Sequence, residues 1–446
     1  MKVSGLTIAA VVLVALVGLL YWSNHRKPED TVKASADTPP KILSLTDADL
    51  SKIAIKKRGA DETVLARNGA NKWEMSAPKP LPVDQDAVSS MVSSLSSLNS
   101  DRLVEDKATD WKEYGLADPS LEVDITKKDG KTTKLEIGDD TPTGSSAYAR
   151  LEGDPRVFTI ASYNKTSIDK GPNDLRDKRL LIVDSDKISR VELVTQTKDK
   201  AGDVEFGRDK DQWQIIKPKP LRADGLQVEE LVRKVKDAKM DTAVSDEDAK
   251  KAAAAFASGT PVATVKVTDS TGTKELQVRK NKDDYYAKSS SVDGVYKVSS
   301  ELGTGLDKNL DDFRNKKLFE FGFNDPNKIE MHDGAKAYSL TKGGEDWWSN
   351  GKKMDVTSVQ GFLDKVRDLA ASKFVDAGFT SPEVDLTVWS NDNKRVEKVL
   401  ISKSGDKYIA KRDGEPALYE LDAKTVDDLR KAAGDVKPAA AAPSKK

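Results

Sequence analysis

Three stretches of the chain place apolar residues at positions i, i+3, i+4, i+7 and i+10, the spacing of one face of an α-helix. These residues are Val88, Met91, Val92, Leu95 and Leu98; Val228, Leu231, Val232, Val235 and Ala238; and Val359, Phe362, Leu363, Val366 and Leu369. An aspartate stands four positions before each stretch (Asp84, Asp224 and Asp355), where its carboxylate can cap the free N–H groups of the first turn. The pattern therefore predicts one amphipathic helix that occurs three times.

Strand-like runs surround each predicted helix in the same order. Before the helix come an acidic turn with an alternating strand, a second short strand and a strand that contains tryptophan. After it come four runs: Leu121–Thr126, Lys134–Ile137, Ala147–Leu151 and Val157–Ile160 in the first copy; Ala263–Val267, Lys274–Val278, Tyr285–Lys288 and Val295–Val298 in the second; Leu386–Trp389, Lys398–Ile401, Tyr408–Lys411 and Ala417–Leu421 in the third. Turn residues between these runs are typical of antiparallel hairpins.

We therefore predict an α+β fold: three tandem repeats of mainly antiparallel sheet, each covered by one amphipathic helix, preceded by a single N-terminal transmembrane helix. A recurring junction, Asp174–Leu180 and Asp312–Leu318, separates the repeats. The predicted parts are a transmembrane anchor (1–23), a linker (24–41), the repeats (42–179, 180–317 and 318–436) and a disordered tail (437–446) that is rich in proline, alanine and lysine.

The tryptophan strand continues in two copies into the same proline-rich segment. Trp73 and Trp213 are each followed five residues later by Pro-Lys-Pro-Leu, which we expect to cross to the helix as an extended linker because proline cannot continue a strand or helix. The third copy has Trp347-Trp348 and lacks the prolines. We expect Trp73, Trp213 and Trp348 to pack in the core under the helix; a platform for stacking glycans is the alternative.

The N-terminus carries the longest apolar run. Residues 3–22 are twenty residues in length, or ~30 Å as a helix, which is about the thickness of a bilayer's hydrocarbon core. We predict an uncleaved single-pass anchor that binds the lipid bilayer through residues 3–22; cleavage of a signal peptide near Ala36 is the alternative. Lys2 and the amino terminus nearly balance Arg26 and Lys27, and we expect the body to be extracytoplasmic (periplasmic), with the chain in the inner (cytoplasmic) membrane.

Composition excludes several classes of function. The chain has 73 Lys and Arg residues against 74 Asp and Glu residues, so no net basic charge favours nucleic acid as a partner. It has no cysteine, which excludes disulfides, thiolate metal sites, a cysteine nucleophile and a lipidated cysteine.

No pattern typical of catalysis is present. The histidines are His25, beside the apolar run, and His332, which we expect in an exposed turn. Ser-x-x-Lys pairs (Ser76/Lys79, Ser162/Lys165, Ser349/Lys352) are expected by chance in a chain this rich in serine and lysine. The acidic pairs (Asp139-Asp140, Asp184/Asp186) do not continue into an EF-hand loop, and we expect solvated acids in turns, with a weak Ca²⁺ site as the alternative. We therefore predict no catalytic, cofactor-binding or metal-binding residues and no enzyme activity, and we assign no ligand-binding residue.

Several longer motifs resemble a known bacterial family. They are Trp73 to Asp86, Tyr114-Gly-Leu-Ala-Asp-Pro119, Ile137-Gly-Asp-Asp-Thr-Pro-Thr-Gly144 and Asp174 to Leu181, and together with the N-terminal anchor they resemble domain of unknown function 4340. The resemblance is strongest in the first repeat, and the third lacks the proline segment and the Tyr-Gly-Leu motif. Members are often encoded beside ABC transporters of the gliding-motility type, so the resemblance implies an envelope protein that works with a transporter and carries over no catalytic residue.

Two functions remain at this point. The first is a membrane-anchored, non-enzymatic envelope protein that acts as an interaction scaffold or as an accessory of an ABC-transporter-type assembly. The second is an extracytoplasmic module that binds cell-wall glycan or another exported polymer. A glycan-binding module needs exposed aromatic rings along a groove, whereas a scaffold needs a docking patch or a free sheet edge.

Overall fold

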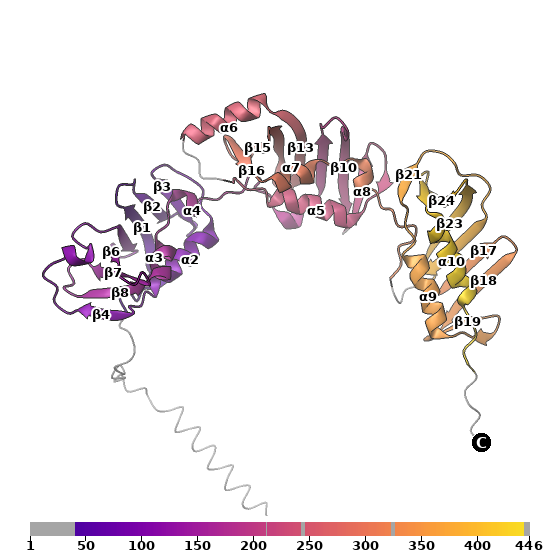
Figure 1. Ribbon diagram of the computed structural model, residues 1–446, viewed down its shortest axis with the longest axis horizontal. Helices are drawn as coiled ribbons and strands as arrows, with labels where there is room; N and C mark the ends of the chain where they lie inside the picture. Colours follow the sequence, from indigo (N-terminus) through magenta and orange to yellow (C-terminus); the bar gives the residue numbers. More distant parts are fainter. Residues whose placement is uncertain (1–40, 211, 242–245, 323–325, 441–446) are drawn as a thin grey trace, which may run out of the picture. The chain divides into compact units, whose positions relative to one another are not determined.

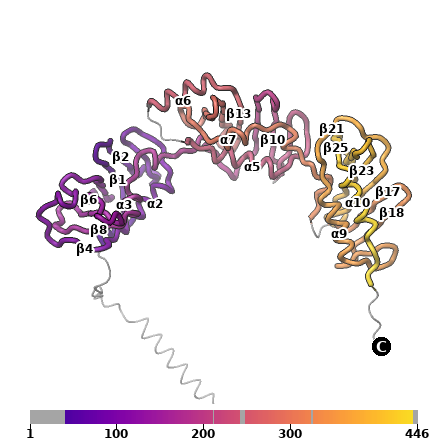
Figure 2. The backbone as a smooth tube through the Cα atoms, viewed as in Figure 1, coloured from indigo at the N-terminus to yellow at the C-terminus, as the bar shows by residue number. Residues whose placement is uncertain are grey.

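The computed structural model describes residues 41–210, 212–241, 246–322 and 326–440, and its contacts divide the chain after Asp177 into two compact units. The described part of the first unit holds one sheet, and that of the second holds two (Figure 1). Figure 2 shows each sheet within a narrow range of colour, because each is built from a contiguous stretch of chain. All neighbouring strands are antiparallel, so the predicted α+β fold with tandem sheets is confirmed for the described residues.

The described residues of the first unit form an eight-stranded sheet in the order β3-β2-β1-β5-β6-β7-β8-β4. Its strands are β1 (Leu50–Lys57), β2 (Thr63–Arg67), β3 (Trp73–Ala77), β4 (Arg102–Glu105), β5 (Leu121–Lys127), β6 (Thr132–Asp140), β7 (Ser146–Leu151) and β8 (Val157–Ala161). Its helices are η1 (Asp47–Asp49), α2 (Gln85–Ser96), η2 (Lys112–Tyr114), α3 (Ser162–Ile168) and α4 (Pro172–Leu175).

The second unit begins with a sheet of the order β12-β11-β10-β9-β13-β14-β15-β16. Its strands are β9 (Arg190–Thr195), β10 (Gly202–Asp209), β11 (Gln212–Lys217), β12 (Leu221–Arg222), β13 (Thr260–Asp269), β14 (Gly272–Asn281), β15 (Asp284–Ser289) and β16 (Val295–Val298). Its helices are η3 (Ser185–Lys187), α5 (Gly225–Lys236), α6 (Asp246–Ser258), α7 (Ser300–Leu306) and α8 (Leu310–Phe313).

The third sheet has the order β20-β19-β18-β17-β22-β23-β24-β25-β21. Its strands are β17 (Lys328–Asp333), β18 (Lys336–Gly343), β19 (Asp346–Ser349), β20 (Lys352–Lys353), β21 (Lys373–Val375), β22 (Val384–Ser390), β23 (Arg395–Ser404), β24 (Lys407–Arg412) and β25 (Leu418–Leu421). Two helices, α9 (Val356–Arg367) and α10 (Ala423–Asp435), lie on one face of it (Figure 1).

The three predicted amphipathic helices are α2, α5 and α9, each twelve residues long. Every residue of the three apolar stretches is buried in the core of its own sheet. Asp84 and Asp224 each accept hydrogen bonds from two N–H groups of the first turn, and Asp355 accepts one from Ser358. The prediction of the repeated helix and its aspartate caps is confirmed.

Main-chain hydrogen bonds recur at the start of each sheet domain. The N–H of Ile42 donates to the carbonyl of Leu98, that of Leu180 to Ala238, and that of Leu318 to Leu369, at 2.8–2.9 Å. The acceptor in each case is the last residue of that repeat's apolar stretch, which lies just after the helix ends. This bond holds the segment that enters each repeat against the end of its helix.

The proline segment does not cross the fold as an extended linker, and that prediction is wrong. Met75 and Leu81 exchange main-chain hydrogen bonds, so the chain turns back at Pro78–Pro80 and pairs with the strand it has just left. In the second sheet β12 pairs with β11 in the same way. Prolines lack an N–H group, but they occupy only the turn, and the flanking residues supply the donors for pairing.

The prediction of disorder from residue 437 onward is also wrong for the first residues of the tail. Lys437 accepts a hydrogen bond from the N–H of Asp355, and Ala439 donates to the carbonyl of Lys353. These bonds satisfy main-chain groups beside the N-terminus of α9, so pairing orders a segment whose composition favours disorder. In the earlier repeats the carbonyls of Leu175 and Phe313 accept the equivalent bond from Asp84 and Asp224.

The face of each sheet opposite the amphipathic helix has a different cover in each repeat. In the first sheet Trp111, Tyr114 and Leu116 pack there beside Tyr148. In the second sheet α6 takes this place (Figure 1). Phe256 of α6 packs against Arg279 of β14, whose chain neighbour Val278 faces the core on the other side of the strand. The sequence analysis did not predict α6. In the third sheet the equivalent segment is a loop that bonds to Ser402 through Thr380.

No helix within the described residues is long and apolar enough to span a membrane. The predicted anchor at residues 3–22, the alternative cleavage site at Ala36 and His25 lie outside the described residues.

Candidate functional site

The tryptophans that recur along the chain are core residues. Trp73 and Trp213 are buried, and so is Trp347, which is 7 % exposed, whereas Trp348 is 40 % exposed. The expectation that Trp348 is the third member of the set is therefore wrong. In the strand ladder Trp347 lies opposite a basic residue, Lys342, just as Trp73 and Trp213 lie opposite arginines. Trp347 therefore has the same register as the other two tryptophans, and this register places it on the core face.

The other residues singled out in the sequence do not come together. His332 is exposed at the end of β17, as predicted. Lys165 pairs with Asp140 rather than with Ser162, whose hydroxyl donates to the carbonyl of Gly144. No group of three or more His, Cys, Asp or Glu side chains in the described part of the chain could hold a metal ion.

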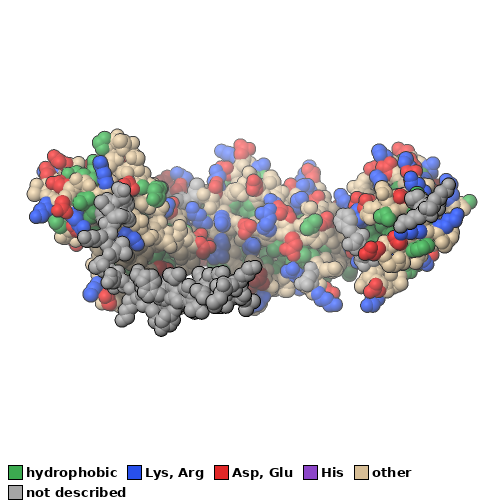
Figure 3. All heavy atoms as spheres, turned by 90° about the horizontal axis from the view of Figure 1, so that it is seen from below, with side chains coloured by type: hydrophobic (Ala, Val, Ile, Leu, Met, Phe, Trp, Pro, Cys, Tyr) green, Lys and Arg blue, Asp and Glu red, His purple; other side chains and the backbone are tan. Residues whose placement is uncertain are grey.

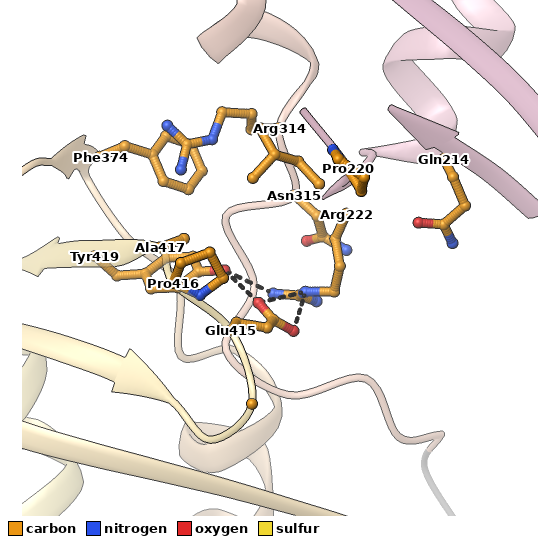
Figure 4. A pocket seen from close by; sticks show the side chains of 12 residues that line it. Gln214, Pro220, Arg222, Arg314, Asn315, Phe374, Glu415, Pro416, Ala417 and Tyr419 are labelled. Atoms are coloured by element: carbon orange, nitrogen blue, oxygen red, sulfur yellow. Dashed lines mark hydrogen bonds and ion pairs between the residues drawn. The ribbon is translucent and has the colours of Figure 1, made fainter. Parts of the chain in front are cut away.

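A polar cluster is centred on Arg222 of β12, where the second and third sheets meet (Figure 4). Its guanidinium lies 2.7 Å from Glu320 and 3.0 Å from Glu415, donates to the carbonyl of Lys317 at 2.6 Å and lies 3.2 Å from the hydroxyl of Tyr419. Two of these partners, Glu415 and Tyr419, belong to the loop before β25 and to β25 itself. A single side chain thus joins the edge of one sheet to the next.

The cluster continues into the third sheet through alternating charges. Glu320 also pairs with Arg395, which pairs with the buried Glu397, and Glu397 pairs with the buried Arg412. The guanidinium of Arg412 also lies 3.0 Å from the carboxylate of Glu415, which closes the cluster. Each charge that leaves water therefore has a partner of opposite sign, which buried ion pairs require.

The ionisation of the cluster follows from this geometry. Burial opposes the charged form of Glu320, but the positive charges of Arg222 and Arg395 lower its pKa below the usual range. Burial also disfavours the charged guanidinium, yet Tyr419, Glu415 and Glu320 together raise the pKa of Arg222. Burial raises the pKa of the Tyr419 phenol. At neutral pH Glu320 and Arg222 are therefore charged, and the Tyr419 phenol is neutral.

Two recesses adjoin Arg222. One is a cavity of about 260 Å³ on the side of Tyr419, where the guanidinium of Arg314 stacks 3.4 Å from the ring centre of Phe374 (Figure 4). The other is a hollow of about 490 Å³, on the side of α5. Its walls come from the start of α5, from β11 and from the junction before the third sheet; they include Trp213, Arg222, Asp224, Leu226, Glu229, Asn315, Lys316, Lys317 and Glu320. We call this second recess the α5 hollow.

The residues that line the two recesses supply charged, hydrogen-bonding and apolar groups. These groups are the guanidinium of Arg222, the ammonium groups of Lys316 and Lys317, several carboxylates and the side chain of Leu226. Sequence reasoning missed the site because its parts lie far apart in the chain; Arg222 and Glu415 are separated by 193 residues. The one local signal was the recurring junction, whose second copy, Asp312–Leu318, contributes to both recesses.

In the first unit, two motifs on which the family resemblance depends pack against each other. A Cβ atom at Gly138 would overlap the carbonyl oxygen of Tyr114, and one at Gly115 would overlap Asp139. The phenol of Tyr114 donates to Glu105 at 2.8 Å, and this hydrogen bond raises the pKa of Tyr114 to about 12. The Tyr-Gly-Leu and Ile-Gly-Asp-Asp motifs therefore serve the close approach of two main chains.

Comparison with known proteins shows the family of the chain. No curated protein and no solved structure matches it. The family model described as Domain of unknown function (DUF4340) matches twice in succession, at residues 73–214 and 213–385, and each match begins at the tryptophan strand. The first match ends in the tryptophan strand of the second repeat, and the second match runs past α9 to the start of β22 in the third repeat. Because the two matches together span well over half of its 446 residues, the chain belongs to the DUF4340 family.

Proposed function

We propose that this protein is a membrane-anchored, non-enzymatic scaffold of the cell envelope, which binds the bilayer through residues 3–22 and a protein partner through its extracytoplasmic body. An ABC-transporter-type assembly is the partner that the family resemblance favours. The apolar length of residues 3–22 supports the anchor.

One observation carries the scaffold proposal. The side chains that recur from repeat to repeat, namely the apolar stretches, the aspartate caps and the buried tryptophans, all serve the three cores. The segments that differ from repeat to repeat, such as α6, cover the opposite faces of the sheets. A repeated core with varied surfaces is what a protein that presents several docking faces requires.

The alternative, a module that binds glycan, has less support. The recurring tryptophans are buried, and the large aromatic residues that are exposed in the described ranges, Tyr163 and Trp348, belong to different units. Acidic and basic side chains are interspersed on the face shown in Figure 3. An aromatic groove for sugar rings is therefore not formed by these residues.

The location of the body is tested with a single thiol, because the chain has no cysteine. Tyr163→Cys introduces one at an exposed position. A membrane-impermeant maleimide should label it in intact cells once any outer membrane is permeabilised, and the labelled protein should stay in the membrane pellet after a carbonate wash. Labelling only after the inner membrane is broken would place the body in the cytoplasm.

The partner is tested by cross-linking in native membranes. A photo-reactive amino acid is placed at Val396, which is exposed on β23, in the full chain and in a chain that lacks residues 3–22. The full chain should form a discrete product with a transporter subunit, and the chain without the anchor should form much less. A product that contains polysaccharide instead of protein would favour the glycan alternative, and the lack of any product from several exposed positions would contradict the scaffold.

A further inference from the structure

Away from the α5 hollow, one row of side chains crosses the face of the third sheet that lies opposite α9 and α10 (Figure 1). In the strand ladders its members lie directly opposite one another, in the order Lys353, Trp348, Thr341, Lys328, Trp389 and Val396. Trp348 is 40 % exposed, Val396 is 55 % exposed, and Trp389 is partly buried. We call these six residues the tryptophan row.

The same row is polar in the other two sheets. The ladders equate Trp348, Trp389 and Val396 with Glu74, Thr126 and Thr132 in the first sheet, and with Gln214, Thr268 and Thr273 in the second. In both of those sheets the two threonine hydroxyls share a hydrogen bond. Only the third sheet therefore carries two indoles and a valine at these positions, although none of them adds to its core. A cluster of apolar side chains that faces water marks a surface that another molecule covers.

The charges of the row are paired within the sheet. Glu330 lies 2.8 Å from Lys328, and Asp346 lies 2.8 Å from Lys353. The row therefore has no surplus charge to attract an acidic peptide, a polyphosphate or an anionic lipid. The ammonium group of Lys328 also lies 4.4 Å from the ring centre of Trp389, so it occupies a ring face that a sugar would need for stacking.

The kinds of residue in the row read alike from either end. Thr341 of β18 and Lys328 of β17 form its central pair, and a tryptophan stands one strand outside each of them. Consider a twofold axis parallel to the strands, between β17 and β18. It would place Trp348 of one copy against Trp389 of another, and Lys328 against Thr341. The row is therefore complementary to itself.

The neighbouring row fits the same axis. Glu330 and Ser339 lie directly opposite one another on β17 and β18, so Glu330 of one copy would face Ser339 of the other. Each charged group beside the axis thus meets a hydroxyl, and like charges do not face each other. Two sheets that pack face to face keep their strands nearly aligned, which this axis allows.

We propose that the tryptophan row pairs with the same row of a second copy of this chain, which makes the protein a twofold symmetric dimer through its third sheet. The inference goes beyond the proposed function, because it concerns a second copy and not the envelope partner. With strands ~4.8 Å apart, six strands and three rows of side chains bury roughly 1,000 Å² in total, near the lower limit for a specific interface. The dimer is therefore weak in solution, and the proposed anchor favours it because two chains in one bilayer meet at a higher local concentration.

The first test is sedimentation velocity of the full-length protein in a density-matched detergent, over a range of protein concentrations. The wild type should shift from monomer to dimer as its concentration rises. Trp348→Gln with Trp389→Thr gives the third sheet the residue types of the second at these positions, and should raise the dissociation constant roughly tenfold or more. The matched control, Tyr163→Thr with Leu226→Gln, removes two exposed apolar side chains elsewhere and should leave the constant unchanged.

The second test locates the axis and keeps both tryptophans, so it does not depend on how the double variant folds. Lys353 and Val396 are exposed at the two ends of the row. The axis brings Lys353 of one copy to Val396 of the other, and it holds identical positions ~24 Å apart, five strand spacings. Because the chain has no cysteine, a short bis-maleimide should join a mixture of Lys353→Cys and Val396→Cys chains, and should join neither variant to itself.

Three outcomes contradict the dimer. The wild type could remain monomeric at every concentration. Both double variants could lose the dimer to the same extent, which would make the association independent of the tryptophan row. Either single-cysteine chain could cross-link to itself as well as it does to the other, which would exclude the proposed axis.

Photo-cross-linking in native membranes separates the dimer from the proposed function. The photo-reactive residue at Val396 should give a product of two copies beside the product with the partner, and Trp348→Gln with Trp389→Thr should remove the two-copy product. A partner product alone would overturn the dimer and leave the scaffold function in place. A two-copy product alone, from Val396 and from other exposed positions, would support the dimer and contradict the proposed partner.

Discussion

Glu320 lies 2.7 Å from Arg222, and this contact ties the edge strand of the second sheet to the first residues of the third. The two side chains are 98 residues apart in sequence and are only partly exposed. Arg222 also reaches Glu415, so its guanidinium holds both the entrance and a loop of the third sheet. The contact therefore joins two sheets within the second unit.

Removal of the Arg222 guanidinium should destabilise the junction between the second and third sheets. Arg222→Met leaves Glu320 and Glu415 without their cation and should destabilise the junction by ~2–5 kcal/mol. Spin labels at Asp283→Cys and Lys394→Cys, both exposed, report the change as a broader distance distribution. Arg233→Met, which removes an exposed pair with Glu230, should have little effect on stability and leave the distribution narrow. An unchanged distribution in both variants would show that Arg222 does not hold the junction.

The amphipathic helix of the second sheet offers a matched pair of leucines. Leu231 is 2 % exposed and Leu226 is 81 % exposed, five residues apart on the same helix. Leu231→Ala should lower the free energy of unfolding by ~2–5 kcal/mol because it leaves a cavity. Leu226→Ala should change it by about 0.5 kcal/mol or less. Pulse proteolysis in urea measures both, and equal effects would mean that α5 does not build the core.

The close approach of the two glycine motifs in the first unit is tested by adding a methyl group. Gly138→Ala should destabilise the unit by ~1–3 kcal/mol, because the new Cβ meets the main chain of Tyr114, which cannot move aside as a flexible side chain would. Gly69→Ala adds the same group where nothing lies within 4 Å and should have little effect. The phenol titration at 295 nm gives a second readout, since displacement of Tyr114 from Glu105 should bring its pKa down toward 10.

Asp269 should make the second sheet sensitive to acid. Its carboxylate accepts hydrogen bonds from the N–H of Asp184, from Thr271 and from Lys274, and these bonds hold its pKa well below the usual range. In the unfolded chain its pKa returns to ~3.9, so the stabilising contribution is fully present above that pH and is lost as the pH falls toward the lower, folded value.

The comparison is between wild type and Asp269→Asn in urea unfolding at pH 7 and pH 3. Wild type should be the more stable protein at pH 7, and its advantage should shrink at pH 3. Asp283→Asn, at an exposed carboxylate, should show no such trend. An advantage that is the same at both pH values would mean that the charge of Asp269 does not contribute.

Features set by neighbouring residues were predictable from the sequence. The apolar stretch from Val88 to Leu98 and its cap at Asp84 lie within a few helical turns, so their periodicity alone predicts both the helix and the face it buries. Its two further copies and the alternating strands predict tandem antiparallel sheets for the same reason. The matches of the family model at residues 73–214 and 213–385 agree with this repetition.

Features set by partners far along the chain were decided by tertiary structure. Strand register, rather than residue type, buries Trp347 and leaves Trp348 exposed. Main-chain pairing orders Lys437, whose side chain and neighbours favour disorder. Arg222 acquires its role only when folding brings Glu320 and Glu415 to it. Local periodicity carries no information about such contacts. The partner of a charged residue is decided only when loop closure and strand pairing bring a distant part of the chain beside it.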